Sequence, residues 1–400
     1  LGLARPRYRV ITVAGTNGKG STVAYLDAVL RACGHRTGSL TSPHLLRYNE
    51  RVRVEGRQAA DAELVEVFER IERARGRTTL TFFEYNALAA LQLFADRQVE
   101  VAVLEVGLGG RLDATNIVDA DVGVVCSVGL DHRDWLGDTL DAIGAEKAGI
   151  FRAGRPAVLG SADMPATVFG TIERLHARPV VAGREFDFRM TGETWTYRGL
   201  AATLPDLPAP ALAGGIQFRN AATALAAYEC LPGLNPLRRE AVAEALRATR
   251  LPGRFQILEV PSASVGAVPG GTVEWILDVA HNEPAAQVLA SHLRARPVAG
   301  KTYAVASILR DKDAPAIGRA LASSIDEWIV CGLPGPRGSS ASEVAERLAE
   351  VMHAPLLADD VSDACQLASA RARPGDRIVV LGSFGTVGSA LRWLGYTEVG

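Results

Sequence analysis

The stretch VITVAGTNGKGST, Val10–Thr22, decides the fold of this chain. Its apolar, β-branched residues end in a glycine-rich turn that holds one lysine, and helix-forming residues follow. The glycines let backbone N–H groups approach a phosphate, Lys19 adds a positive charge, and the hydroxyl of Ser21 or Thr22 can bind Mg²⁺. The stretch therefore predicts a strand, a phosphate-binding loop and a helix, in a chain that binds ATP.

The loop departs from the general phosphate-loop pattern in two ways. The pattern has a glycine five residues before its Gly-Lys pair, where this chain has Val13, and Gly20 separates Lys19 from Ser21. The alternative is an ordinary glycine-rich turn with a solvent-facing lysine. The order of strand, turn and helix favours phosphate binding.

The composition is that of a compact globular protein with two domains. The chain has 400 residues, of which 48% are hydrophobic and 22% are charged. Its 43 basic and 45 acidic side chains give a net charge of −2, which argues against nucleic acid or an anionic membrane as a partner. We expect small-molecule substrates and a monomer.

Cysteine spacing and the apolar runs indicate the compartment. Five cysteines are widely spaced and form no C-x-x-C pair, so we expect free thiols in the core and neither disulfides nor a zinc site. No apolar run reaches the roughly 18 residues that a membrane span needs, and no cleavable signal opens the chain. These features predict a cytoplasmic protein.

Apolar strands alternate with amphipathic helices in the first part of the chain, which predicts a doubly wound, mostly parallel α/β sheet. Strands are expected at Val10–Val13, near Ser39, and at Val99–Val106, Val122–Val128 and Ala157–Leu159, with helices at Phe83–Ala95 and Ala142–Gly149. Short polar runs in Val180–Pro210 predict an antiparallel excursion, and a helix is expected at about Asn220–Cys230.

The sequence RLPG ends a helical pattern near residue 250, so we expect domains at residues 1–250 and 251–400. The alternation then restarts and predicts a smaller, Rossmann-like α/β domain. Its expected strands are Val273–Val279, Tyr303–Ser307, Trp328–Cys331 and Arg377–Leu381, and its expected helices are Pro284–Arg294, Ala314–Ser323 and Ser342–Met352, the last with a capping box from Ser340 to Glu343. The segment Pro261–Gly271 is expected to be a surface loop insertion.

Polar residues follow several of these strands. Glu105 interrupts the apolar run VAVLEV, and at the carboxyl edge of a parallel sheet it is placed to bind Mg²⁺ beside the phosphate loop. A buried structural glutamate paired with an arginine is the alternative. His132 and Ser42 take the same topological position and can complete the Mg²⁺ site, although a histidine there is also common as a packing residue.

Further candidates are one lysine of the first domain and several polar residues next to strands or turns of the second domain. Lys147 lies on an apolar helix end, where a free ammonium is costly unless it is paired, modified or reaches solvent. In ILDVAHN, Asp278, His281 and Asn282 end a strand and can contact ribose or phosphate. Arg254 stands beside the turn LPG, and its planar guanidinium suits an anionic oxygen.

Eleven ordered blocks resemble one known family, the bifunctional dihydrofolate synthase/folylpolyglutamate synthase enzymes of the Mur-ligase-like superfamily. They run from Ala14 to about Gly388: AGTNGKGST, SPHLLRYNERVRV, TFFEYNALAAL, LEVGLGGRLDATNIVDADV, GLDHRDWLG, EKAGIFR, NAATALAA, LPGRF, DVAHN, LRDKD and LGSFGTVG. The resemblance implies a P-loop domain like the central domain of Mur ligases and a C-terminal domain of the glutamate-ligase type.

The resemblance also implies roles for individual residues. ATP contacts are expected from Asn17, Gly18, Lys19, Gly20, Ser21, Asn220, Arg254 and Asp278. Mg²⁺ ligands are expected to be Ser42, Glu105 and His132. Catalytic roles are expected for Lys19, Lys147, Arg254 and His281. The pteridine-bearing substrate is expected to contact Thr81, Phe82, Phe83, Glu84, Leu112, Asp113 and Ala114. Lys147 matches the lysine that the family carbamylates, and the carbamate would support a second Mg²⁺.

The activity implied by the resemblance is ATP-dependent amide ligation. The substrate carboxylate attacks the γ-phosphoryl group to give an acyl phosphate, which the amine of L-glutamate displaces. The RLDATN form, with Asp113, resembles the enzymes that accept dihydropteroate as well as folates. The alternatives are a Mur-type ligase acting on a cell-wall nucleotide, and a nucleotide-dependent switch or binding module without ligase activity.

Overall fold

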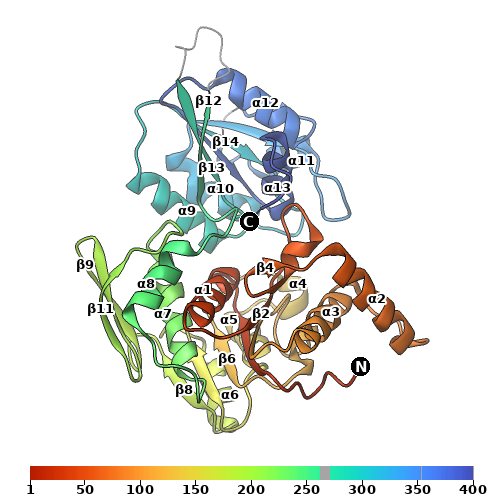
Figure 1. The fold of residues 1–400 in the computed structure, drawn as a ribbon. Helices are drawn as coiled ribbons and strands as arrows, with labels where there is room; N and C mark the ends of the chain where they lie inside the picture. Colours follow the sequence, from red (N-terminus) through yellow and green to blue (C-terminus); the bar gives the residue numbers. More distant parts are fainter. Residues whose placement is uncertain (262–270, 353, 400) are drawn as a thin grey trace. The chain divides into compact units, whose positions relative to one another are not determined.

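The computed structural model describes residues 1–261, 271–352 and 354–399. The expected loop insertion Pro261–Gly271 lies almost wholly outside the described residues. The chain forms two compact units, one of Leu1–Ala211 with Gly215–Arg250 and one of Leu212–Gly214 with Leu251–Gly400. Each unit is a layered α/β structure in which helices cover a mostly parallel sheet (Figure 1).

The main sheet of the first unit has eight strands in the order β4-β3-β2-β5-β1-β6-β7-β8. Six of them pair in parallel: β2 (Thr37–Leu40), β5 (Val101–Glu105), β1 (Arg9–Ala14), β6 (Val122–Val125), β7 (Pro156–Leu159) and β8 (Arg178–Val181). The short strands β3 (Val52–Val54) and β4 (Arg57–Gln58) extend one edge with antiparallel pairing. Strand β1, which leads into the glycine-rich loop, lies between β5 and β6.

Helices cover both faces of this sheet, which explains why its strands are apolar on both sides. One face packs against α3 (Phe82–Asp96), α5 (Leu140–Ala148) and α6 (Ala166–Arg174), whose apolar side chains share clusters with Val10, Leu104 and Leu159. The other face carries α1 (Lys19–Ala32), which packs on α7 (Ile216–Glu229) and α8 (Arg239–Ala248). Helix α2 (Asp61–Arg75) packs on α3 (Figure 1).

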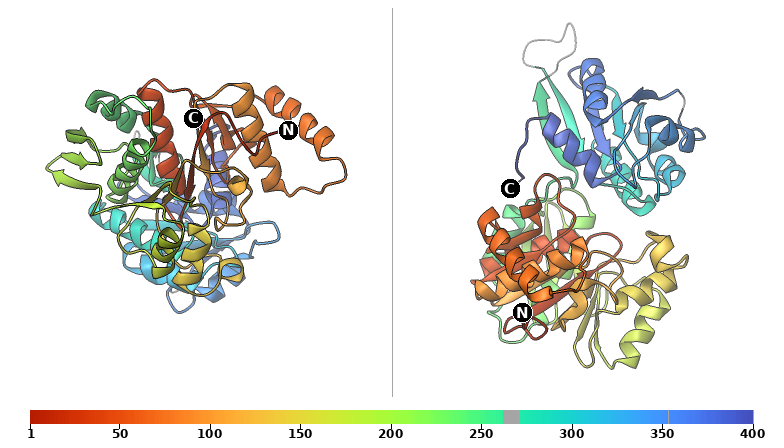
Figure 2. Two further views of the ribbon diagram at one scale, coloured as in Figure 1. Left: turned by 90° about the horizontal axis from the view of Figure 1, so that it is seen from below. Right: turned by 90° about the vertical axis from the view of Figure 1, so that its right-hand side faces the viewer.

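A separate antiparallel sheet in the order β11-β10-β9 projects from the first unit (Figures 1 and 2). Its strands are β9 (Asp187–Thr191), β10 (Thr194–Arg198) and β11 (Thr203–Pro208). Glu229, at the end of α7, fastens it by accepting hydrogen bonds from the hydroxyl of Tyr197 and the backbone N–H groups of residues 200–202. The expected antiparallel excursion is therefore present.

The second unit is built on a six-stranded sheet in the order β12-β13-β17-β14-β15-β16. All strands are parallel except the edge strand β12 (Gln256–Pro261), and the others are β13 (Thr272–Leu277), β17 (Arg377–Leu381), β14 (Thr302–Ala306), β15 (Glu327–Cys331) and β16 (Leu356–Ala358). Its helices are α9 (Glu283–Ala295), α10 (Ala314–Leu321), α11 (Ala341–Arg347), α12 (Val361–Arg371) and α13 (Phe384–Trp393).

The predicted fold class is confirmed for both units, with corrections to single elements. Strand β6 ends at Val125, short of the predicted Val128, because the next residues leave the sheet to hold the glycine-rich loop. Val180 and Val181 belong to β8 of the main sheet, and the antiparallel excursion starts after them. Helix α7 begins at Ile216, before the expected start at about Asn220. Helix α11 ends at Arg347, before the expected end at Met352, because a bifurcated hydrogen bond from the Leu348 N–H tightens its last turn. Strands β3, β4, β12 and β16 were not predicted.

The capping box from Ser340 to Glu343 is confirmed. All five cysteines are buried free thiols, as predicted. Among the described residues, no helix combines the length and the apolar character that a membrane span requires.

A buried charge cluster in the second unit makes a stability prediction. Glu274 accepts hydrogen bonds from Arg377 (2.7 Å) and Arg296 (2.6 Å), and Arg377 is only 2% exposed. Glu274→Leu is expected to lower the free energy of unfolding by roughly 3–5 kcal/mol, because the guanidinium stays buried without its carboxylate. Urea unfolding measures the loss. The double variant Glu274→Leu/Arg377→Leu should recover part of it, and a double variant less stable than the single one would contradict this explanation.

Candidate functional site

The glycine-rich loop needs its glycines at two positions. Gly15 has φ 154° and Gly18 has φ 87°, a region that side chains other than glycine rarely adopt. A Cβ atom on Gly15 would lie 3.1 Å from the Cβ of Cys126, and one on Gly18 would lie 2.9 Å from Oδ1 of Asn220. The backbone of the loop can therefore come close to its neighbours, and to a ligand, only because it lacks side chains here.

The loop is held by the segment that follows β6. The Thr16 N–H donates to the Ser127 carbonyl (2.9 Å), and the Thr16 hydroxyl donates to the Gly129 carbonyl (3.0 Å) while accepting from the Gly129 N–H (2.9 Å). Ser127 Oγ accepts from the Asn17 N–H and donates to the Asn17 carbonyl, both at 3.0 Å. These bonds fix the shape of the loop before any ligand binds, which lowers the ordering cost of binding.

The start of α1 suits an anion. No side chain caps the helix at Gly18, and its first turn holds no acidic residue, so the first N–H groups and the positive end of the helix dipole are available to phosphate. The Lys19 ammonium donates to the carbonyls of Gly15 (2.8 Å) and Thr16 (3.3 Å). Its charge is thereby held over the loop.

Glu105 lies at the same edge of the sheet. It is the last residue of β5, where the register places it beside Val13 of β1, and it is 4% exposed. The backbone N–H of Ser42 donates to its Oε2 (3.1 Å). A carboxylate, a serine and a phosphate loop at one sheet edge match the oxygen ligands that Mg²⁺ takes, with phosphate oxygens and water completing the set.

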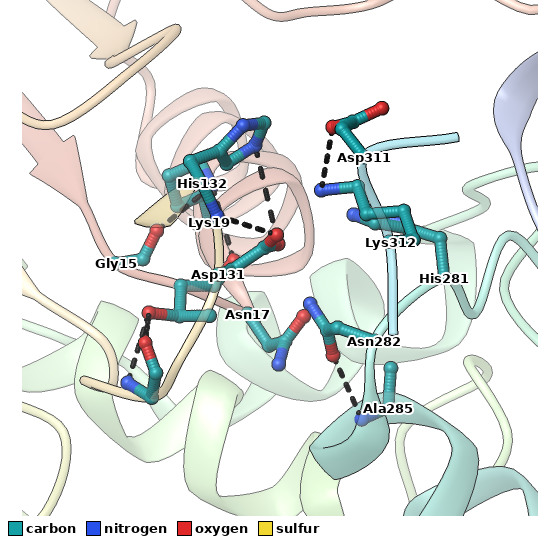
Figure 3. A network of polar contacts seen from close by, with 12 residues as sticks. Gly15, Asn17, Lys19, Asp131, His132, His281, Asn282, Ala285, Asp311 and Lys312 are labelled. Atoms are coloured by element: carbon teal, nitrogen blue, oxygen red, sulfur yellow. Dashed lines mark hydrogen bonds and ion pairs between the residues drawn. The ribbon is translucent and has the colours of Figure 1, made fainter. Parts of the chain in front are cut away.

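His132 reaches this region from the loop before α4 (Arg133–Leu136). It has φ 52°, and its Nε2 lies 3.9 Å from Oδ2 of Asp131. Figure 3 shows the side chains of His132 and Asp131 beside that of Lys19. Within residues 1–261, 271–352 and 354–399, no group of three or more His, Cys, Asp and Glu side chains could hold a metal by itself, so a metal here would draw on hydroxyl and phosphate oxygens as well.

Lys147 is buried close to the loop. It lies in the last turn of α5 and is 4% exposed. Burial, and then the nearby charge of Lys19, lowers its pKa from 10.5 to about 7, against the opposing effect of Asp131. Lys147 is therefore buried rather than reaching solvent, and its burial favours the neutral form of the amine.

Asn220 brings α7 to the loop. Its Nδ2 donates to Oε1 of Gln217 (3.1 Å), while its Oδ1 faces Gly18. The first unit thus brings Asn17, Gly18, Lys19, Asn220, Glu105 and Ser42 to one sheet edge, with Lys147 within electrostatic range of Lys19.

The residues expected to contact a pteridine divide into two kinds. Thr81 and Glu84 form the capping box of α3, and Asp113 caps the turn at Ala114–Ile117 and accepts from the Leu108 N–H (2.9 Å). Phe82 and Leu112 are instead exposed, at 62% and 79%. The first group shapes the backbone, and the second offers apolar surface to a flat substrate.

Two side chains beside Phe82 were missed by the sequence analysis. The Arg51 guanidinium lies 5.1 Å from the centre of the Phe82 ring, and Tyr48 packs edge-on against the same ring. Phe83 lies over Gly107, where a Cβ would come within 2.7 Å of its ring. Both Tyr48 and Arg51 belong to the block SPHLLRYNERVRV, which was the available signal in the sequence. Only the fold shows that this block contacts Phe82 of α3.

The second unit gathers its candidates at the carboxyl end of β13. Asp278 is partly buried and accepts from the N–H groups of Phe255 and Ala280, both at 2.8 Å. Burial raises its pKa, and the charge of Arg254 opposes the shift. Arg254 stacks 4.9 Å from the centre of the Phe384 ring. Asp278 and Arg254 therefore lie together, as expected for a ligand site at this edge.

His281 and Asn282 continue this edge into α9. His281 Nδ1 lies 2.8 Å from the Val279 carbonyl, and Asn282 caps the helix by accepting from the Ala285 N–H (3.0 Å). Lys312 lies beside His281 in Figure 3 and its ammonium is 3.8 Å from Asp311. Lys312 belongs to the block LRDKD, but its sequence context predicts no role for it.

Comparison with known proteins agrees with this geometry. Residues 13–182 match the Mur ligase middle domain, and residues 253–384 match the glutamate ligase domain of Mur ligases. The dihydrofolate synthase/folylpolyglutamate synthase of Escherichia coli (strain K12) is 43% identical over 388 residues, which cover 97% of this chain and 87% of the relative. The enzyme of the same name from Mycobacterium tuberculosis is 32% identical and is covered to 87%.

Solved structures give the same result. E. coli FolC in complex with DHPP and ADP has a TM-score of 0.89 and 42% identity, covering 98% of this chain and 90% of that one. A bifunctional folylpolyglutamate synthase/dihydrofolate synthase with Mn, AMPPNP and L-glutamate bound has the same TM-score and identity, covering 98% and 91%. The chain belongs to the dihydrofolate synthase/folylpolyglutamate synthase family of Mur ligases.

Proposed function

We propose that this chain uses ATP to join L-glutamate to dihydropteroate and to folates. The observation that carries the proposal is the preorganised loop at the start of α1 beside the buried carboxylate of Glu105. The names of its relatives and the DHPP, ADP, AMPPNP, Mn and L-glutamate of their solved structures support the same substrates. We also propose that residues 1–250 bind ATP and the pterin and that residues 251–400 form the glutamate-ligase part.

The proposed reaction has two steps. The substrate carboxylate attacks the γ-phosphorus of ATP, the bond to the β-phosphate oxygen breaks, and an acyl phosphate and ADP form. The amine of L-glutamate then attacks the acyl carbon, inorganic phosphate leaves, and a proton is lost as the amide forms. Positioning and charge stabilisation, more than covalent chemistry by the protein, supply the rate of such phosphoryl transfers.

The residues of the first unit divide the work. The N–H groups at the start of α1 and the Lys19 ammonium bind phosphate oxygens and stabilise the charge that spreads over the transferred group. Ser42, Glu105 and His132 are the residues that would hold Mg²⁺. When bound, the metal neutralises phosphate charge and orients the oxygens. Asn220 from α7, and Arg254, Asp278 and His281 from the second unit, are proposed as further nucleotide or catalytic contacts.

We also propose that Lys147 is carbamylated and supports a second Mg²⁺. A buried amine with a pKa of about 7 is partly unprotonated near neutral pH, and its nitrogen can attack CO₂, forming a C–N bond and releasing a proton. The product is an anion in place of a cation beside Lys19. We expect activity near pH 7 to rise when bicarbonate is restored to CO₂-depleted enzyme, and Lys147→Met to show no such response.

The pKa of Lys147 predicts how stability depends on pH. Between about pH 7 and the unfolded value of about 10.4, the unfolded chain binds the proton that the folded chain has lost, so the free energy of unfolding rises with pH. In CO₂-depleted buffer, the free energy of unfolding of wild type should rise relative to that of Lys147→Met by up to about 1.4 kcal/mol for each pH unit in this window. Chemical unfolding at pH 7, 8 and 9 measures the gain. Parallel curves for the two proteins would show that the lysine is not buried in this way.

One assay tests the proposed function. ADP release and product mass are measured with dihydropteroate and then with a reduced folate, each with and without L-glutamate. A ligase of this kind releases ADP only when acceptor and glutamate are both present, and each product gains one glutamyl unit. ADP release triggered by UDP-linked acceptors would favour a cell-wall ligase, and hydrolysis unaffected by glutamate would favour a nucleotide-dependent switch.

A further inference from the structure

Arg219 lies next to the candidate nucleotide site with part of its guanidinium unpaired. It is on α7, one residue before Asn220, and its Nε is buried without a hydrogen-bond partner. The side chain as a whole is half-buried, so the unsatisfied group is the Nε–H. Burial lowers the pKa of Arg219. A charged donor buried without an acceptor costs free energy that an anionic ligand would return.

Two neighbours, Cys126 and Asn220, connect Arg219 with the glycine-rich loop. It lies within electrostatic range of Cys126, and Cys126 lies in the same range of Lys19 and Glu105. Cys126 also lies next to the position that a Cβ on Gly15 would take (3.1 Å). The neighbouring residue Asn220 faces the same loop at Gly18, so α7 presents two consecutive polar side chains in this region.

The carboxylate whose charge acts on Arg219 does not pair with it. Asp163, on the loop after β7, opposes the lowering of the pKa of Arg219, but it is exposed and forms no ion pair with it in the described residues. Cys126 is a buried thiol whose pKa is raised to about 11, so it is neutral near pH 7 and offers no anion. The described part of the first unit thus brings a cation to the loop without a matching carboxylate.

We propose that Arg219 is a further nucleotide-binding residue whose guanidinium donates hydrogen bonds to the phosphate chain of ATP and ADP. The proposal rests on the proposed function, because it assumes that the loop holds a nucleotide. A planar guanidinium can donate two parallel bonds to phosphate oxygens, and it acts there beside the single charge of Lys19. Arg219 thereby adds affinity for the polyphosphate and has no part in moving protons.

Calorimetric titration with ADP tests the proposal on the full chain. Arg219→Gln keeps a polar side chain but removes the charge, and it is expected to weaken ADP binding roughly ten- to hundred-fold. Arg219→Lys is expected to weaken it less, because one ammonium keeps the charge but loses the paired geometry. In turnover assays Arg219→Gln should raise the KM for ATP by a similar factor and leave kcat within about three-fold, a split that loss of structure alone would not give.

Asp163→Asn is the matched control. If Arg219 serves only to pair with Asp163, both variants lower the unfolding temperature alike and neither changes ADP affinity, which overturns the proposal. ADP affinity within two-fold of wild type in folded Arg219→Gln overturns it as well. Should Arg219→Gln fail to fold, the same comparison is made with Arg219→Lys. Failure of wild type to bind ADP at all would refute the proposed function itself. This outcome is therefore distinguishable from failure of the Arg219 proposal alone.

Discussion

Replacing Glu105 with glutamine is expected to lower kcat about a thousand-fold or more and to leave the fold intact. The carboxylate is 4% exposed at the end of β5, beside the phosphate loop, and the amide has nearly the same shape. The amide oxygen can still accept the hydrogen bond that the Ser42 N–H donates to Glu105 Oε2 at 3.1 Å in the wild type. The change therefore removes a negative charge where a metal is proposed to bind. A decrease in kcat of this size is expected when the opposite charge that stabilises the transition state is lost.

Glu229→Gln is the control for this prediction. Glu229 is also in the first unit, at the end of α7. Its four hydrogen bonds, however, fasten the three-stranded antiparallel sheet. Its amide variant should lower the unfolding temperature and leave kcat nearly unchanged. Calorimetry with Mn²⁺ and AMPPNP should show that Glu105→Gln loses metal-dependent binding. Substantial Mg²⁺-dependent turnover in Glu105→Gln would instead favour the alternative of a purely structural glutamate.

Replacing Lys19 with alanine is expected to lower kcat by about 10²- to 10³-fold and to raise the KM for ATP. Its ammonium is held over the loop by the Gly15 and Thr16 carbonyls, so it meets phosphate oxygens in the bound state and supports the charge of the transferred group in the transition state. Both constants should therefore change. Steady-state kinetics with ATP as the varied substrate separates them.

Lys301→Ala provides the comparison for Lys19. Lys301 pairs with Glu327 at an exposed site of the second unit (2.7 Å), and surface pairs of this kind contribute little. Its removal should leave both constants as in wild type. If Lys19→Ala behaved like Lys301→Ala, the lysine would be an ordinary surface residue in a glycine-rich turn, which is the alternative that the sequence left open.

The sequence was most informative where chemistry and local structure coincide. The glycines, Lys19 and the following helix predict the loop because strand, turn and helix come in the order that phosphate binding requires. Glu105 could be placed at the sheet edge because a charge that ends an apolar parallel strand has only that position to occupy. Lys147 stood out for a related reason, since an ammonium on an apolar helix face is expensive, and the structure shows that it is buried.

Contacts between distant segments could not be predicted in this way. Nothing in the local sequence says that Cys126 and Asn220 limit the space at Gly15 and Gly18, because those contacts depend on how β6 and α7 pack. The end of β6 was misplaced for the same reason: residues 126–128 are apolar enough for a strand but leave the sheet to hold the loop. Arg219 gave no signal, since an arginine on a helix is usually exposed.

Local patterns also concealed structural uses of candidate site residues. Thr81 and Glu84 are committed to the capping box of α3, which S/T-x-x-E spacing predicts as readily as it fits a ligand contact. Asp278 likewise holds two backbone N–H groups. Side chains of this kind can contact a ligand only through the lone pairs that remain, so their variants would change stability and affinity together.

The central claim is that the loop at the start of α1 holds the triphosphate beside a metal bound by Glu105. Crystals of the chain soaked with AMPPNP and Mn²⁺ test it most directly, because anomalous scattering locates the metal. We expect a manganese peak at the Glu105 carboxylate and phosphate oxygens on the N–H groups at the start of α1. A nucleotide bound elsewhere, or a metal without Glu105 among its ligands, would contradict it.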